Sequence, residues 1–527
     1  MSPAAPSPEA PPPPSRSARL IPRPALFWAG VVLTAAGVAE HLWMFTRSAT
    51  MDYRMNSMGM TPTMWGAMVA IVVGVAASGL ALRRPPGAIA AAATPVRLTR
   101  AGRLRLICIL SFGLLVDQMK PATLAFIEPG MRTEFHLTAS EVAWLPTVAL
   151  TGTVVGSLVW GRAADRIGRR ATILLASLLF LGTTVCATMP SFAGNLVMCA
   201  LMGMAAGGMV PVVYALMTEM LPPGRRAAIM VLQAGLSTTG GYIAASGLAA
   251  VFVPLVGWRM LWFAQLPPVL MLILLNHWIP ESAAFAGGRA RVKRLPATAL
   301  FRADHVSRTL VVTIYALAWG LVYWGFVTFL PTLFASGQHG MSAATLLFYS
   351  SLLSIPTCLV AAWLYTRWSA RGTMTGYALL TVGALLALAV IGTHGSRAAT
   401  LTAIMALFAG TSGVIALLGP YTAEIYPTLI RGTAGGWAAA VGKSGGAFGP
   451  PLIALVLSAP GGMRSAAVFV ALPMAVAAVA IATRGMPRTV GADDSSLDAE
   501  LDAALAADAT LPPASAAPAS DGGTPTW

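Results

Sequence analysis

The chain has few charged residues. Asp, Glu, Lys and Arg make up 10% of its 527 residues, whereas a soluble domain carries roughly 25%. So few charges could not cover a water-facing surface, which excludes a single soluble domain and a disordered chain. The sequence also has only four cysteines, all inside apolar runs. They predict buried thiols and exclude a disulfide framework or a zinc site.

Apolar residues are abundant instead. They form 56% of the chain, and the mean hydropathy is +0.72. A spanning helix needs roughly 20 apolar residues, and the runs of that length number fourteen. The sequence therefore predicts an all-α polytopic membrane protein with 14 transmembrane helices, two in an N-terminal hairpin and two sets of six after it.

Composition divides the chain further. We expect a disordered Pro-rich tail over 1–24, the extra two-helix hairpin over 25–82, a basic cytoplasmic linker over 83–105, an N-terminal six-helix half over 106–279, a cytoplasmic loop between the halves over 280–307, a C-terminal six-helix half over 309–484, and a disordered acidic tail over 486–527.

The basic residues are distributed unevenly along this topology. With the N-terminus inside, 26 Lys and Arg fall in inside segments and 6 in outside loops. This asymmetry is typical of membrane orientation, and it explains the net charge of +15 without a nucleic-acid partner. We expect both termini in the cytoplasm and the chain in an inner or plasma membrane.

The second set of six helices repeats the first at a constant offset of 205 residues. Glu219, Pro222 and Arg226 fall on Glu424, Pro427 and Arg431. Two parallel six-helix halves are typical of a carrier that rocks around a substrate site near the bilayer midplane.

The second helix of the first half is followed by a glycine- and arginine-rich loop, Gly161-Arg162-Ala163-Ala164-Asp165-Arg166-Ile167-Gly168-Arg169-Arg170. It resembles the signature loop of the major facilitator superfamily, which implies that family's fold and solute transport by alternating access. The resemblance covers about 104–484. In it Asp165 would contact a helix N-terminus and close the inner gate, although a solvated charge run that only fixes topology remains an alternative. The gating residues are Gly161, Arg162, Asp165, Arg166, Gly168, Arg169, Arg170, Glu219, Arg226, Glu424 and Arg431.

Further motifs are similar to those of the aromatic acid:proton symporters and the sugar porters within that superfamily. They include Pro280-Glu281-Ser282 and Tyr426-Pro427-Thr428. The aromatic-acid subgroup has an Asp-Gly-x-Asp pattern in its first core helix. Here the first acid is Asp117, and the second position is Lys120.

Three ionisable residues lie deep in the predicted core helices, namely Asp117, Lys120 and Lys443. Each costs on the order of 3 kcal/mol at this depth, so each should face a cavity or a partner. We interpret Asp117 as the proton-coupling group and the lysines as ligands for an anionic substrate. The alternative is a structural ion pair between Asp117 and Lys120, which are three residues apart.

Aromatic residues recur along the seventh core helix. Tyr315, Trp319 and Tyr323 share one helical stripe and predict a wall for a planar substrate, with Gln233 as a polar contact. Packing against lipid or another helix is the alternative.

The remaining predictions concern ligands. We expect a small carboxylate and protons as the transported species, a lipid bilayer around a monomeric transport unit, no cofactor, no metal site and no enzymatic activity. A sugar or neutral solute is the first alternative. The second is a copper carrier that uses the Met-rich loop at Met51, Met55, Met58 and Met60, because thioethers select Cu(I).

The topology generates a first testable prediction. Single cysteines placed in the 46–62 loop should react with an impermeant maleimide added outside intact cells, and a cysteine near Ala90 should not. The opposite or an equal pattern would contradict the fourteen-helix topology.

Overall fold

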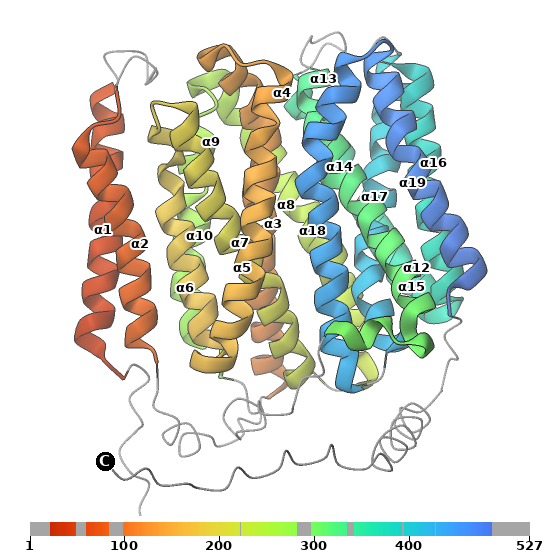
Figure 1. The fold of residues 1–527 in the computed structure, drawn as a ribbon, viewed down its shortest axis with the longest axis horizontal. Helices are drawn as coiled ribbons and strands as arrows, with labels where there is room; N and C mark the ends of the chain where they lie inside the picture. The colour runs from red at the N-terminus through yellow and green to blue at the C-terminus, as the bar shows by residue number, and fades with distance from the viewer. Residues whose placement is uncertain are drawn as a thin grey trace, which may run out of the picture.

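The computed structural model describes residues 22–48, 59–83, 99–221, 223–281, 297–334, 342–392, 395–426 and 428–486. Over these ranges the fold is helical, and fourteen helices are long and apolar enough to cross a membrane. The predicted all-α, fourteen-helix architecture is therefore confirmed (Figure 1). Most of both predicted tails and of the basic linker lies outside the described residues.

The N-terminal half follows the hairpin α1 (Pro24–Arg47) and α2 (Pro62–Ala81). Its elements are α3 (Arg100–Phe135), α4 (Ala139–Val142), α5 (Trp144–Ile167), α6 (Arg169–Gly182), η3 (Thr183–Thr188), α7 (Phe192–Met220), α8 (Pro223–Val256), α9 (Met260–Phe263), α10 (Leu266–Leu275) and η4 (Asn276–Trp278).

The C-terminal half has the same plan. Its elements are η6 (Ala297–Phe301), α12 (Ala303–Gly320), η7 (Leu321–Phe326), η8 (Val327–Phe329), α13 (Leu330–Leu333), α14 (Ala343–Leu353), α15 (Ile355–Arg367), α16 (Ala370–Ile391), α17 (Arg397–Ile425), α18 (Thr428–Ser458) and α19 (Gly462–Arg484). The repeat is visible in the bounds, because α7 and α17 are both 29 residues long and begin 205 residues apart.

Side-chain caps explain where several helices begin. Thr99, Ser191, Ser342, Ser369 and Ser396 each accept a hydrogen bond from the backbone N–H three residues further on. Such a cap satisfies one of the amides that a helix N-terminus leaves free. Local sequence therefore sets the start of a helix even where the apolar run is ambiguous.

The two halves lie side by side (Figure 1). Contacts between them are made by α5 with α18, by α8 with α14 and α17, and by α3 with α13. We call the end of the bundle at Arg100 and Gly168 the linker end, and the end at Phe135 and Leu333 the opposite end. Any solute held between the halves must pass one of these two ends.

The extra hairpin packs on one side of the N-terminal half. Its two helices contact each other closely, and they contact α6 and η3. A Cβ atom built on Gly30 would overlap the carbonyl oxygen of Gly74, and one on Gly74 would overlap the hydroxyl of Thr34. Small residues thus let the two backbones approach, as in other membrane helix pairs.

The close approach generates a second prediction. Gly30→Leu should destabilise the hairpin by roughly 1–3 kcal/mol, because the added side chain overlaps the α2 backbone. A melting curve of the purified chain measures this loss. Gly66→Leu is the matched control, since nothing lies within 4 Å of a Cβ at Gly66. Equal melting temperatures for the two variants would contradict the packing.

Candidate functional site

Asp117 lies half-way along α3 and is 2% exposed. Its Oδ2 accepts a hydrogen bond from the Gln118 side chain at 3.1 Å. Its Oδ1 has no hydrogen-bond partner among the described residues. The charges that act on this carboxylate come from Lys443 of the other half, so Asp117 faces the C-terminal half.

Lys443 lies half-way along α18 and is partly buried. Its Nζ donates to the hydroxyl of Ser157 on α5 at 3.0 Å. The Ser157 hydroxyl donates in turn to the carbonyl oxygens of Thr153 and Gly207, both at 2.8 Å. Lys443 therefore reaches across the interface between the halves, and its charge interacts with that of Asp117.

Lys120 is placed apart from this pair. Its Nζ donates to the Phe180 carbonyl oxygen at 2.7 Å and to the Thr183 hydroxyl at 3.2 Å, and it lies 5.1 Å from the centroid of the Phe180 ring. The α6 helix changes to a 3-10 helix at Thr183, which loosens the regular backbone hydrogen bonding there. Lys120 is fully buried at this break, and the structure does not bring it together with Asp117.

The predicted aromatic stripe divides into two parts. The Tyr315 hydroxyl donates to the Met374 carbonyl oxygen on α16 at 3.1 Å, so Tyr315 packs inside the C-terminal half. The Trp319 and Tyr323 rings stack at 5.3 Å, and Trp324 contacts Tyr323 edge-on at 4.9 Å. Leu321–Phe326 is a π-helix. It begins after Tyr315 and Trp319, so it alters the spacing of Tyr323 and Trp324 alone.

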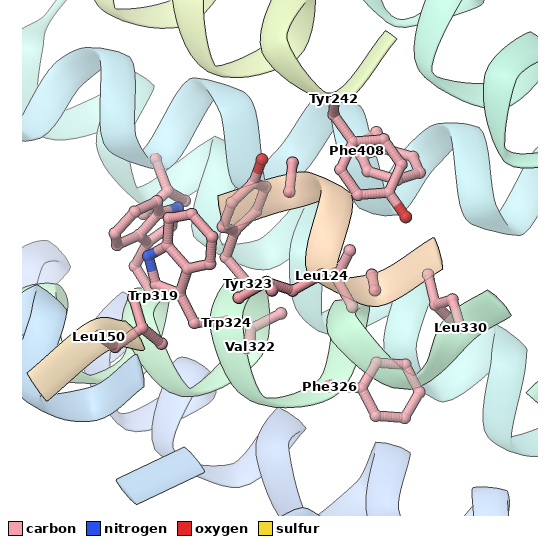
Figure 2. Packing of buried hydrophobic residues seen from close by; sticks show 14 of the residues in the cluster. Leu124, Leu150, Tyr242, Trp319, Val322, Tyr323, Trp324, Phe326, Leu330 and Phe408 are labelled. Carbon is pink, nitrogen blue, oxygen red and sulfur yellow. The ribbon is translucent and has the colours of Figure 1, made fainter. Parts of the chain in front are cut away.

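Tyr323 and Trp324 border a small cavity between the halves, with a volume of about 10 Å³, which is room for about one water molecule. Figure 2 shows Tyr323 and Trp324 near Leu124 of α3, and Tyr242 of α8 against Phe408. The Tyr242 ring lies 4.5 Å from that of Phe408, and its hydroxyl has no partner among the described residues. The other lining residues are Pro121, Ala122, Ala125, Val327 and Thr328.

Gln233 lies on α8 and is almost fully buried. Its Nε2 donates to the Ser111 hydroxyl on α3 at 3.2 Å, and its Oε1 has no partner among the described residues. The side chain therefore keeps one free acceptor within the N-terminal half.

The signature loop makes a turn at Gly168, whose φ is +101°. A Cβ there would meet the Glu281 carboxylate, which accepts a hydrogen bond from the Arg169 backbone N–H at 2.8 Å. The loop thus rests on the end of the sixth core helix. The repeat also has a contact at the linker end, since the Tyr365 hydroxyl donates to Glu424 at 2.7 Å.

Several predicted gating and metal residues lie outside the described part of the structure. These are the side chains of Arg162, Asp165, Glu219, Arg226 and Arg431, and the loop methionines Met51, Met55 and Met58. Near that loop, His41 is buried, and its Nδ1 bonds to the Gly37 carbonyl oxygen at 2.8 Å. The gate and the copper alternative stay predictions.

Glu128 was missed by the sequence analysis. It lies in the last third of α3 and is 1% exposed, and neither carboxylate oxygen has a hydrogen-bond partner among the described residues. The sequence analysis counted only three ionisable residues deep in the core helices. The signal that could have found Glu128 is its place within the apolar segment, four residues before Arg132.

A family model described as Major Facilitator Superfamily matches residues 108–450. The chain belongs to this family. Members are transporters and not enzymes, so the chain is a multi-pass membrane transporter of the major facilitator superfamily.

Relatives within the superfamily carry aromatic and unsaturated acids. A niacin transporter of Acinetobacter baylyi is 26% identical over 71% of this chain and 92% of its own length. The cis,cis-muconate transport protein of the same organism is 28% identical over 66% and 85%, and a gallate transporter of Pseudomonas putida is 26% identical over 73% and 92%. A solved D-xylose-proton symporter has the same fold, with a TM-score of 0.61, 16% identity and coverage of 72% and 98%.

The interface between the halves generates a third prediction. The Thr239 hydroxyl of α8 lies 3.7 Å from the Cys358 sulfur of α15, and it donates to Ser412 of α17 at 2.7 Å. Thr239→Cys should therefore form an oxidative cross-link to Cys358 that joins the two halves. A protease site inserted in the 282–296 segment reports the cross-link, because linked halves stay together after cleavage.

Thr238→Cys is the matched control. The Thr238 hydroxyl donates to the Ala234 carbonyl oxygen within its own helix at 3.0 Å, so this neighbour should leave the halves separable. Cross-linking that is equal in the two variants, or absent from both, would contradict this arrangement of α8 and α15.

Proposed function

We propose that the chain imports a small organic carboxylate, with an aromatic or conjugated body, together with protons. The observation that carries the proposal is the placement of Asp117 and Lys443 half-way along helices of opposite halves. The relatives named for niacin, muconate and gallate support the same substrate class.

The Lys443 charge can be neutralised by two carboxylates in turn, first that of Asp117 and then that of the substrate. While Asp117 is ionised, it neutralises Lys443 across the interface. When Asp117 takes up a proton, Lys443 is left without a counter-charge, which is costly in the middle of a membrane. A substrate carboxylate restores the balance. Proton and substrate therefore bind together, which is the condition for symport.

The aromatic residues supply a surface for the substrate body. Tyr323 stacks on Trp319, which itself packs beside Gly442, the residue before Lys443. A ring whose carboxylate meets Lys443 would thus lie against this aromatic pair. Gln233 keeps a free acceptor for a substrate hydroxyl or ring N–H. We assign no substrate contact to Tyr315 or Lys120, since each is bonded within its own half.

The gate and orientation complete the proposal. The charge asymmetry of the sequence supports an orientation with the linker end and both termini on the cytoplasmic side of a cell membrane. Asp165 lies at that end and would close it by contact with the N-terminus of α18. The site lies between the two halves of one chain, so a monomer is the transport unit.

A sugar porter is the second candidate, because the solved D-xylose-proton symporter shares the fold. That likeness is 16% in identity and concerns the fold alone. A neutral sugar would leave Lys443 without a counter-charge each time Asp117 is protonated. This difference in charge balance favours the carboxylate.

The site generates a fourth prediction. Lys443→Met should weaken carboxylate binding about ten- to a hundredfold, because a charge-assisted contact worth about 1.5–3 kcal/mol is lost. Asp117→Asn should abolish proton-driven accumulation and retain exchange. Uptake and exchange of labelled nicotinate, benzoate, gallate and cis,cis-muconate in reconstituted vesicles measure both effects.

Lys120→Met is the matched control, since it removes a buried lysine that does not reach the interface. Its affinity should stay within about threefold of the unchanged chain. If Lys120→Met weakens binding as strongly as Lys443→Met, the assignment of the substrate carboxylate to Lys443 fails. Uptake of D-xylose and of none of the acids would favour the sugar porter.

A further inference from the structure

Glu128 has a property that the central site does not account for. It lies in an apolar helix, both of its oxygens are buried, and neither has a hydrogen-bond partner among the described residues. A carboxylate in such a place keeps its charge only at a cost of several kcal/mol. A neutral carboxylic acid avoids most of that cost. The observed packing therefore favours Glu128 with a proton bound.

The position of Glu128 links it to the interface between the halves. On a helix of 100° per residue, Glu128 shares a face with Pro121, seven residues earlier, and with Asp117, eleven residues earlier. Pro121 borders the cavity between the halves. Ala125, three residues before Glu128, borders the same cavity together with Tyr323 and Trp324 of the other half.

Glu128 lies about 16 Å from Asp117 along α3, at a rise of 1.5 Å per residue, and toward the opposite end. There α3 packs against η8 and α13 of the C-terminal half. The contact of α3 with α13 is the place where the halves meet at that end. Opening the bundle at that end must separate these elements and expose Glu128 to water.

The charged groups around Glu128 are few. The Arg132 guanidinium, one turn further along α3, acts on it electrostatically, and the Arg132 Nε is itself buried without a partner among the described residues. Nothing in Val327–Phe329 or Leu330–Leu333 titrates. Tyr242 on α8 borders the cavity, Glu134 is paired with Arg259 at 2.7 Å, and Glu141 on α4 bonds to Thr138.

We propose that Glu128 is a second proton-binding site. It takes a proton from the outer solution at the opposite end of the bundle, called the outer end here, and the bound proton allows that end to close. Water solvates the carboxylate while the outer end is open. Closure buries it, so closure requires that the carboxylate first accept a proton and become a neutral acid. This inference rests on the proposed proton-coupled import for its driving force and orientation.

The test measures the outer end directly and needs no substrate. Ala125→Cys supplies a label in the cavity lining, in a full-length chain whose four native cysteines are replaced. Right-side-out vesicles are treated with an impermeant maleimide between about pH 5 and 9. Labelling is divided at each pH by that of the same cysteine in the denatured chain, which removes the effect of thiol ionisation on the reaction. This ratio should rise with external pH, by up to about tenfold per pH unit in the titrating range, because one proton controls closure.

Glu128→Gln should remove this pH dependence and keep labelling slow, because the amide mimics the protonated acid. Glu141→Gln is the matched control, since Gln also supports a capping box, and it should behave as the unchanged chain does. A Glu128→Gln variant that keeps the pH dependence would overturn the proposal. So would an unchanged chain whose labelling does not depend on pH.

The gel-filtration elution and the melting curve of each variant show whether that variant folds. If Glu128→Gln does not fold, Glu128→Asp replaces it, because the shorter acid should move the midpoint of the pH dependence. An unmoved midpoint would then overturn the proposal. Transport of none of the tested acids would refute the proposed function, while the labelling result would still decide the role of Glu128.

Discussion

The arrangement of this carrier depends on one constraint, which is that an ionisable group inside an apolar bundle must find a partner, water or a proton. Four ionisable groups deep in the described helices meet it in different ways. Lys120 bonds to a carbonyl oxygen at a break in α6. Asp117 and Lys443 act on each other across the halves. Glu128 has no partner among the described residues and is therefore where protonation has the largest effect on packing.

This constraint also explains why the interface between the halves is polar in places. Ser157 receives Lys443, and Thr239 donates to Ser412. Apolar side chains of both halves also share one buried cluster, so these polar bonds lie beside apolar packing. Aromatic stacking of Trp319 on Tyr323 adds a rigid surface beside the charges. A site with fixed walls and exchangeable counter-charges suits a carrier whose cargo is itself charged.

The extra hairpin contacts the end of α6, the stretch that also accepts a hydrogen bond from Lys120. A Cβ on Gly182 would meet Ile71 of α2, and Gly182 immediately precedes the 3-10 segment. Phe180, whose carbonyl oxygen accepts from Lys120, belongs to the same stretch. Lys120 and the hairpin therefore both contact the end of α6.

The sequence by itself determined the class of fold, the number of helices and the repeat of two halves, because apolar length and residue spacing are local properties that the bilayer makes decisive. It also identified Asp117 and Lys443, since a charge in an apolar run is visible without any structure. Only the tertiary structure decided which residues these side chains contact. Lys120 bonds to α6, Tyr315 bonds to α16, and Glu128 is buried without a hydrogen-bond partner among the described residues, because these outcomes depend on which helix packs against which face.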